Sequence, residues 1–382
     1  MMKKSRNILH LPEDLVVEIL SRVPAVSLAR LRSTSKAWNV LIKDGRLATE
    51  HYGNAPKHSL IIMLIAFRVY LVSVDLHQVY NNKVKVASQF SLKDPLYDSF
   101  KEVDICNIFH CDGLLLCTTV DNRLVVWNPC SGEVKWIQPR RSNERFTIFA
   151  LSKSSSNKYK ILRINQTLEY GVTSWKILLD WEIYDFTINS WRVVGKLTNS
   201  WFIPNMNERG TSVNGNAYWL ANSKDLTNMD FLLGFDFSSE RFTSVSLPWD
   251  DHLPYYHLIA LSVTREDQKL CIIASQVMQS SSRDVWIATK IESSTGAASW
   301  AKFLSLRLVN KPFYFASGMN FLVEEEDKVL VCRGKMDGVS TCFLHVVGED
   351  NKCIQVDHHD PESTCSLVVS YVPTLVQIQQ GS

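Results

Sequence analysis

Residues 11–42, LPEDLVVEILSRVPAVSLARLRSTSKAWNVLI, determine the fold of the amino-terminal part of the chain. Pro12 suits the first position of a helix, where its fixed φ helps and its missing N–H is not needed. Apolar residues follow at offsets that place them on one face of that helix, and Pro24 ends it. The apolar residues of this face are Leu15, Val16, Ile19, Leu20 and Val23.

Two more short helices are expected before residue 43. Ser27 and Ser35 are placed to cap them, because a serine hydroxyl accepts a hydrogen bond from the free N–H groups at a helix start. A unit of roughly 40 residues is at the limit of independent stability and needs a partner, a metal or a disulfide. No cysteine lies in this stretch, so the sequence favours a partner protein. The apolar residues of the two helices are Leu28, Leu31, Trp38, Leu41 and Ile42.

This stretch resembles the F-box, whose motif it carries in order and with the usual spacing. Two positions depart from the motif: Val23 stands where leucine is commoner, and Thr34 stands where a larger aliphatic residue is commoner. Neither departure introduces a charge. The matching segments are Leu11-Pro12-x-Asp14-Leu15, Glu18-Ile19-Leu20-x-Arg22-Val23-Pro24, Ser27-Leu28-x-Arg30-x-Arg32, Lys36-x-Trp38 and Leu41-Ile42.

The resemblance implies docking onto the small Skp-type linker protein of a Skp–cullin–F-box ubiquitin ligase. The alternative is a helical hairpin that only packs on the rest of the chain. In the family, the Leu-Pro pair and the apolar face of the helices make the contact with the linker. The residues that the resemblance implies for this contact are Leu11, Pro12, Leu15, Ile19, Leu20 and Leu28.

Composition excludes several classes of protein. Of the 382 residues, 46% are hydrophobic, so the chain can bury a core and is not disordered as a whole. A net charge of +2 argues against nucleic acid as the main partner. The start, MMKKSRNILH, has no apolar run after its basic residues and is not expected to be a secretory signal. Residues 60–74 are apolar but contain Arg68 and fall short of the roughly 20 residues that span a membrane, so they predict one or two buried strands.

No motif for catalysis, metal or cofactor is found. The nine cysteines form no C-x-x-C pair, which indicates reduced thiols and a location in the cytoplasm or nucleus. The spacing of Cys106, His110, Cys111 and Cys117 fits no standard zinc site, and Asp357-His358-His359-Asp360 is interpreted as a polar turn. The sequence has no nucleophile elbow, Walker loop or dinucleotide-binding glycine motif. We therefore expect a non-catalytic protein without a cofactor.

A repeat organises the chain after residue 58. In its clearest copies a strand ends on an aromatic residue followed by Asn or Asp, and the next strand opens seven positions after the aromatic. Fainter copies surround Trp286 and His345. The aromatic anchors, 57 and 51 residues apart, are Trp127, Tyr184 and Phe235, and the matching openings of the next strand are Val134, Trp191 and Phe242.

A period near 50 with several short strands per unit is typical of a β-propeller. Each unit leaves a sheet face uncovered, and stacking units around an axis buries those faces. The chain after residue 58 is long enough for about six units of this period. The sequence therefore predicts a small all-α three-helix head followed by an all-β repeat domain, a six-bladed kelch-like β-propeller.

The repeat region also resembles the plant F-box-associated interaction domain, from about residue 105 to at least 308. Motifs in order carry this resemblance, among them CDGLLLC (111–117), WNPCSGEVKWI (127–137) and LGFDFSSERF (233–242). The resemblance implies a substrate-recruiting module. The expected domains are an F-box at 5–46, a linker at 47–58 and a propeller-like substrate-recognition domain at 59–382. Residues 43–58 are expected to carry a short helical continuation and then a linker.

The two resemblances together imply an adaptor without chemistry of its own. The head would bind the Skp-type linker, and through it a cullin scaffold, while the β-domain would bind an unknown target protein for ubiquitination. Neither nucleic acid nor a membrane is expected as a partner. The alternative is a stand-alone protein- or carbohydrate-binding propeller with no ligase role.

Overall fold

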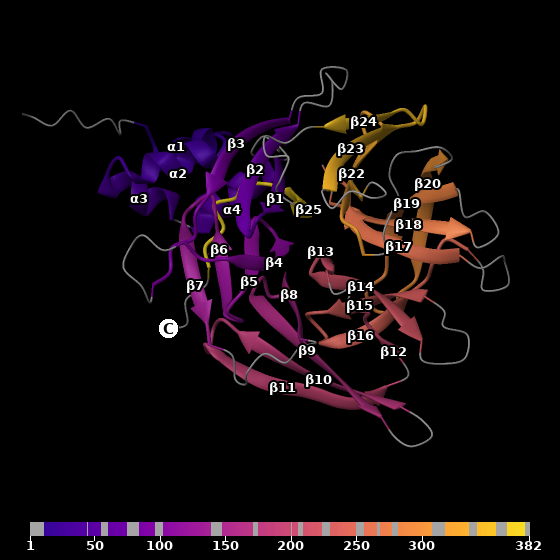
Figure 1. The fold of residues 1–382 in the computed structure, drawn as a ribbon. Coiled ribbons are helices and arrows are strands. Elements are labelled where there is room, and N and C mark those ends of the chain that lie inside the picture. Colours follow the sequence, from indigo (N-terminus) through magenta and orange to yellow (C-terminus); the bar gives the residue numbers. More distant parts are fainter. Residues whose placement is uncertain are drawn as a thin grey trace, which may run out of the picture.

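The structure is a computed structural model that combines a helical head with a ring of β-sheets (Figure 1). The residues that it describes are 11–43, 45–54, 60–74, 84–95, 102–138, 147–170, 175–199, 201–204, 209–223, 230–249, 256–265, 268–276, 282–307, 318–335, 342–356 and 365–378. No helix in these ranges is both long enough and apolar enough to cross a bilayer.

The head contains α1 (Glu13–Ser21), α2 (Ala25–Arg32), α3 (Lys36–Ile42) and α4 (Gly45–Asn54). The predicted cap of α3 is confirmed, because the Ser35 hydroxyl accepts a hydrogen bond of 3.2 Å from the Trp38 N–H. The predicted cap of α2 is wrong. Pro24 occupies the N-cap position, so α2 begins at Ala25 and Ser27 lies inside its first turn.

Helix α4 packs against α1, so the head extends beyond its three predicted helices. His51 Nε2 lies 2.7 Å from the Val23 carbonyl oxygen, and Arg46 Nη1 lies 2.7 Å from Asp14 Oδ1. Burial lowers the pKa of His51, and its bond to the Val23 carbonyl partly offsets this effect. Part of the stretch expected to be a linker is therefore helical, up to Asn54.

The strands form six sheets, and each sheet is one blade of a propeller. Blade 1 consists of β25 (Cys365–Tyr371), β1 (Leu60–Ile65), β2 (Arg68–Val74) and β3 (Val84–Phe90); blade 2 of β4 (Ile105–Cys111), β5 (Leu114–Thr119), β6 (Leu124–Asn128) and β7 (Glu133–Ile137). Blade 3 consists of β8 (Thr147–Lys153), β9 (Tyr159–Tyr170), β10 (Trp175–Asp185) and β11 (Ser190–Asn199).

The other three blades follow in chain order. In blade 4, β12 (Trp201–Phe202) and β13 (Thr211–Val213) both pair with β14 (Asn216–Ser223), which is followed by β15 (Asp230–Asp236) and β16 (Arg241–Val245). Blade 5 consists of β17 (Tyr256–Val263), β18 (Leu270–Gln276), β19 (Ser282–Ile291) and β20 (Ala298–Arg307). Blade 6 consists of β21 (Phe321–Glu324), β22 (Val329–Lys335), β23 (Cys342–Gly348) and β24 (Cys353–Val356).

The seven-residue spacing seen in the sequence is the register of the last hairpin in blades 2, 3 and 4. The aromatic anchor and the residue seven positions later face each other across the last two strands. The intervening turn places a residue with positive φ before the last strand, as at Gly132 (71°), Asn189 (52°) and Glu240 (57°). The predicted repeat is confirmed. The facing pairs are Trp127 with Val134, Tyr184 with Trp191 and Phe235 with Phe242.

The last of the described strands closes the ring. β25 pairs antiparallel with β1, so Leu60 faces Tyr371 and Leu64 faces Leu367. The first strands of successive blades contact one another in the order β25, β4, β8, β13, β17, β21 and back to β25. The arrangement of the blades around a common axis can be followed in Figure 1. The predicted six-bladed propeller is confirmed.

Candidate functional site

The head has a small core of its own, and that core uses only part of its apolar residues. Val16 and Val17 of α1 are buried in it, together with residues of α2, α3 and α4. A second set of apolar side chains on α1 and just before it remains in solvent. Leu11, Leu15 and Ile19 are 52%, 45% and 54% exposed.

These three exposed residues lie at the start of the head. Leu15 and Ile19 are four positions apart on α1 and so lie on the same side of the helix, and Leu11 lies two residues before the helix begins. We call Leu11, Leu15 and Ile19 the apolar stripe. Pro12, at the N-cap of α1, is also exposed. Four of the six residues predicted to contact a partner therefore lie on the surface, and two of them, Leu15 and Ile19, lie on one side of α1.

The other two predicted contact residues lie in the head core. Leu20 is 6% exposed and Leu28 is 0% exposed, and both pack in a cluster with Ile42 and Leu47. A fully buried side chain offers no area to a second protein in this arrangement. Leu20 and Leu28 therefore support α1 and α2 from beneath, and they do not belong to the apolar stripe.

Charged groups flank the apolar stripe along one side. Glu18 pairs with Arg22 at 3.0 Å, and Asp14 pairs with Arg46, which also contacts Glu50. Hydrogen bonds to Asp14 and Glu50 raise the pKa of Arg46. An apolar centre with a charged rim is the usual composition of a protein–protein interface.

One exposed apolar residue of the head was missed in the sequence. Val40 of α3 is 71% exposed, more than any residue of the apolar stripe. A signal was available, because Val40 lies outside the apolar face that Trp38, Leu41 and Ile42 form at helical spacing. The helical spacing therefore indicates that this valine points away from the core of the head.

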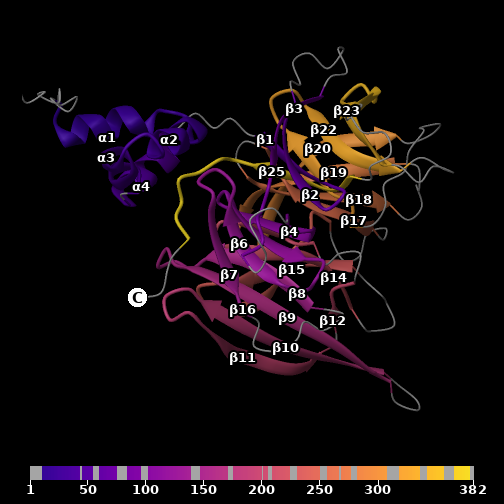
Figure 2. The ribbon, with the colours of Figure 1, turned by 60° about the vertical axis from the view of Figure 1, so that its left-hand side comes forward.

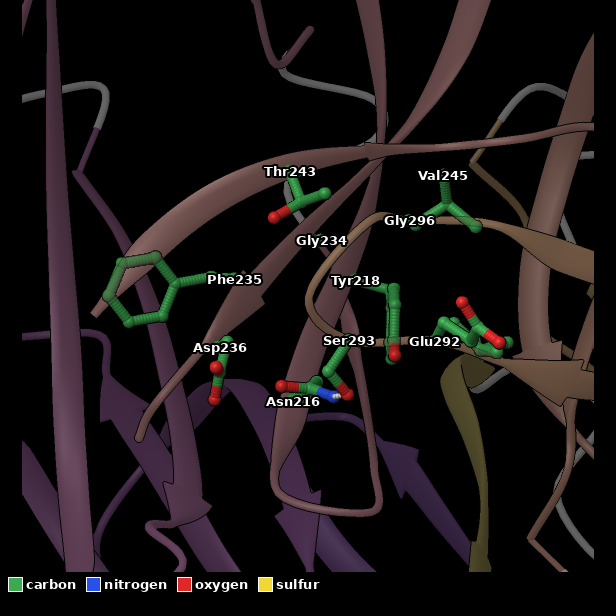
Figure 3. A pocket seen from close by; sticks show the side chains of 11 residues that line it. Asn216, Tyr218, Gly234, Phe235, Asp236, Thr243, Val245, Glu292, Ser293 and Gly296 are labelled. Carbon is green, nitrogen blue, oxygen red and sulfur yellow. Dashed lines mark hydrogen bonds between the residues drawn. The ribbon is translucent and has the colours of Figure 1, made fainter. Parts of the chain in front are cut away.

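The propeller has a small cavity between blades 4 and 5, shown in Figure 3. Its volume is about 10 Å³, roughly the room that one water molecule needs. Asn216 Nδ2 donates to Ser293 Oγ at 2.8 Å across it. A Cβ added at Gly296 would lie 2.0 Å from the Ser244 carbonyl oxygen, so the two blades are in close contact here. This cavity is a packing contact between blades and has no room for a substrate.

A wider groove of about 820 Å³ lies where β3 approaches β6 and β7. Its aromatic lining is largely occupied by contacts within the protein. The ring of Phe90 meets that of Trp127 edge to face at 5.9 Å, and the guanidinium of Arg123 lies 4.6 Å from the centre of the Trp136 ring. Arg123 also binds Asp94, which is 5% exposed. These contacts join blades 1 and 2.

The thiols considered as metal ligands are separated by burial. Cys111 and Cys117 are buried and Cys106 is exposed. Burial raises the pKa of Cys111 and Cys117, so both stay protonated at neutral pH, whereas a ligand or nucleophile must be a thiolate. Among the described residues, no three His, Cys, Asp or Glu side chains gather in a way that could hold a metal ion. Residues 357–360 lie outside the described residues.

Two protein-family models match the chain, one for each region of the structure. The model of the F-box domain matches residues 8–49. The model of the F-box associated beta propeller domain matches residues 60–378, which is most of the chain and contains all six blades. The kelch-like character expected of the repeat stays a prediction, because the matching propeller family is the F-box associated one.

Close relatives extend over the full length. The F-box protein At4g10190 of Arabidopsis thaliana is 62% identical over 376 residues, which cover 98% of this chain and 99% of the relative. The F-box protein At3g21130 of the same plant is 49% identical over 388 residues and covers 100% of both chains. The solved structure of YjhT aligns at 12% identity with a TM-score of 0.40, over 69% of this chain and 84% of that one, and the fold assignment does not rest on it.

Proposed function

We propose that this chain links a target protein to a Skp–cullin–F-box ubiquitin ligase. The proposal starts from the family, because the chain belongs to the F-box proteins with an associated β-propeller domain. In this proposal the head binds the Skp-type linker, the linker binds the cullin, and the propeller binds the target. The chain contributes binding and position, and the ubiquitin-transfer chemistry takes place elsewhere in the assembly.

The apolar stripe is the observation that carries the proposal. Leu11, Leu15 and Ile19 stay exposed although the head has a core to which they could have contributed. Fully burying an aliphatic side chain yields about 1.5–3 kcal/mol, so covering these half-exposed residues yields a few kcal/mol in total. Costs of association consume part of this gain. Together with polar contacts at the rim, affinity in the micromolar to nanomolar range is expected.

The site residues follow from the exposure of each side chain. We assign the contact with the linker to Leu11, Pro12, Leu15 and Ile19, and we assign Leu20 and Leu28 the role of holding α1 and α2 in place beneath the contact. The second candidate function is a stand-alone protein- or carbohydrate-binding propeller. It predicts that no linker is bound, and the same experiment tests it.

The test is co-purification with a plant Skp-type linker after co-expression. Replacing two leucine-sized contacts by carboxylates, in Leu15→Asp with Ile19→Asp, removes burial and adds charge, so binding should fall at least about 100-fold. Val193→Asp is the matched control, because Val193 lies on β11 and its side chain is 53% exposed, close to the 54% of Ile19. The control should bind the linker as the unaltered chain does.

Two results would overturn the proposal. If the unaltered chain recovers no linker, the stand-alone binding function is favoured instead. If the double variant recovers as much linker as the control, the contact lies elsewhere on the head. Circular dichroism of both variants establishes that the helices and strands are retained.

A further inference from the structure

The segment that follows β25, residues 372–378, lies between the head and the propeller. Figure 2 shows it as the yellow stretch that leaves β25 and runs along the side of the ring that faces the four helices. Its side chains alternate between the two regions, as side chains of an extended segment do. Thr374, Val376 and Ile378 contact the propeller, whereas Leu375 and Gln377 contact the head.

On the propeller side, the segment is held by hydrogen bonds and by apolar packing. The Thr374 hydroxyl donates to the Asp112 carbonyl oxygen at 2.9 Å, and the Ile378 N–H donates to Glu133 Oε2 at 3.2 Å. Ile378 is 3% exposed and belongs to the hydrophobic core that blades 2, 3 and 4 share, against which Val376 also packs. The segment therefore continues the packing of the ring.

On the head side, the segment completes the core of the helices. Leu375 is 4% exposed and packs in the cluster that contains Leu20 and Leu28. The Gln377 side-chain amide donates to the carbonyl oxygen of Lys43, at the end of α3. The head core thus includes a side chain that lies more than 300 residues away in the sequence.

Gly113 allows the segment to approach the ring closely. It has φ +78°, a conformation that favours glycine, and it lies in the turn between β4 and β5. A Cβ at this position would lie 2.5 Å from Thr374 Oγ1 and 2.8 Å from the Val372 carbonyl oxygen. Any other residue would push the segment away from blade 2.

Asn128 joins the segment to the repeat. Its Oδ1 accepts hydrogen bonds from the N–H groups of Cys130 and Ser131, at 2.9 and 3.2 Å, and so caps the turn. Its Nδ2 donates to the carbonyl oxygens of Thr374 and Val376, at 3.2 and 2.7 Å. The side chain is 0% exposed, so these bonds form away from water.

The repeat itself shows why this residue is an asparagine. The equivalent position is Asp185 in blade 3 and Asp236 in blade 4, and both carboxylates accept bonds from their own turns, for example from Thr187 N–H and Ser238 N–H at 2.8 Å. An aspartate caps the turn as well as an asparagine does. It has no N–H to donate, however, and its charge would face two carbonyl oxygens at the position of Asn128.

We infer that residues 372–378 form a strap that fixes the orientation of the head on the propeller, and that Asn128 is the positioning residue that locks the strap. The inference rests on the proposed function in one respect, its consequence for ubiquitin transfer. A locked head holds the linker-binding and target-binding regions at one distance from each other. The strap itself is a property of this chain and can be tested without a ligase.

The experiment measures the distance between the two regions in the full chain. Spin labels are placed at Val40 of α3 and at Ile188 in the turn before β11, which are 71% and 62% exposed. Non-canonical amino acids carry the labels, because the chain contains nine cysteines. In pulsed electron resonance, the unaltered chain should give one narrow distance peak. Asn128→Asp should lose that narrow peak. The turn keeps its cap, but the Thr374 and Val376 carbonyl oxygens of the strap lose the hydrogen bonds from the Asn128 amide.

Asp236→Asn is the matched control, because it also exchanges a carboxylate and a carboxamide, at the equivalent position of blade 4, where no strap lies. This variant should keep the narrow peak. Leu375→Ala tests the other side of the strap and should also lose the narrow peak. Hydrogen exchange in β25 shows whether the ring is still closed in each variant. A narrow peak that persists in both Asn128→Asp and Leu375→Ala overturns the inference.

Linker binding separates this inference from the proposed function. With the head folded and the apolar stripe intact, Asn128→Asp should bind the Skp-type linker with the affinity of the unaltered chain. Failure of the unaltered chain to bind the linker counts against the proposed function alone. An unchanged distance peak counts against the strap alone.

Discussion

The propeller and the head treat their apolar residues in opposite ways. The propeller buries most of its apolar residues between its blades, because every blade packs on its neighbours and β25 supplies the strand that closes the ring, and it leaves a few exposed, such as Ile188 and Val193. The head leaves Leu11, Leu15 and Ile19 in solvent, although Leu375 of the strap helps to fill its core. Repetition thus gives one region a closed surface, while the other keeps an open one for a second protein. The same substitution should therefore have different effects in the two regions.

The largest difference in folding stability is expected between two leucine-to-alanine variants, one in each region. Leu367 of β25 is 1% exposed in the core between blades 1 and 2, so Leu367→Ala should lower the free energy of unfolding by about 2–5 kcal/mol. Leu15→Ala should change it by less than about 0.5 kcal/mol, because Leu15 is exposed. Urea titration followed by tryptophan fluorescence measures both. Equal losses in the two variants would contradict the division into a closed and an open region.

A smaller loss of folding stability is expected when the pH is lowered, and it should arise mainly from buried histidines of the propeller. Burial lowers the pKa of His345 on β23 from 6.5 to about 4, so this side chain stays neutral in the fold. The unfolded chain takes up the proton first. The stability contributed by neutral His345 is therefore complete above pH 6.5 and is lost as the pH falls towards 4.

At pH 5 this loss amounts to about 2 kcal/mol relative to pH 7. His345→Leu should remove that part of the pH dependence, and urea titrations at the two pH values measure it. His110, whose pKa burial also lowers to about 4, remains in this variant as a second acid-sensitive group. A His345→Leu chain that loses as much stability between pH 7 and 5 as the unaltered chain would contradict the expectation.

The smallest effect is expected from the helix caps of the head. Ser35→Ala removes the acceptor for the Trp38 N–H and should cost about 1 kcal/mol, seen as faster hydrogen exchange in α3. Ser27→Ala is the control, because Ser27 lies within α2 and alanine has the higher helix propensity. Ser27→Ala should leave exchange in α2 unchanged or slower. Equal acceleration in the two helices would show that both serines act as caps.

The sequence predicted those features that arise from local chemistry. The repeat could be found because blades 2, 3 and 4 each form a hairpin in which an aromatic residue faces the residue seven positions later, with Asn or Asp directly after the aromatic. The start of α1 and the cap of α3 depend on Pro12 and Ser35, which act on their immediate neighbours. Such signals are contained within a few residues, so no knowledge of the fold is needed to recognise them.

Other features depend on contacts that the sequence does not display. Periodicity identified the apolar positions of α1, but the helix is apolar on two sides, and only packing decides that Leu20 faces inward and Ile19 outward. The cap at Ser27 was wrong because Pro24 starts α2 earlier. The repeat has asparagine at position 128 where blades 3 and 4 have aspartate, and the sequence shows this difference. The partner of Asn128, the strap, lies nearly 250 residues away and cannot be found from the repeat.

The position of β25 and the strap in the sequence has a consequence for the synthesis of the protein. The ribosome makes the helices of the head before it makes residues 365–378. Until these residues emerge, the first blade lacks its inner strand and the head lacks Leu375. A nascent chain therefore cannot present a finished head on a closed ring, and a prematurely terminated product leaves both regions open to chaperones and proteases.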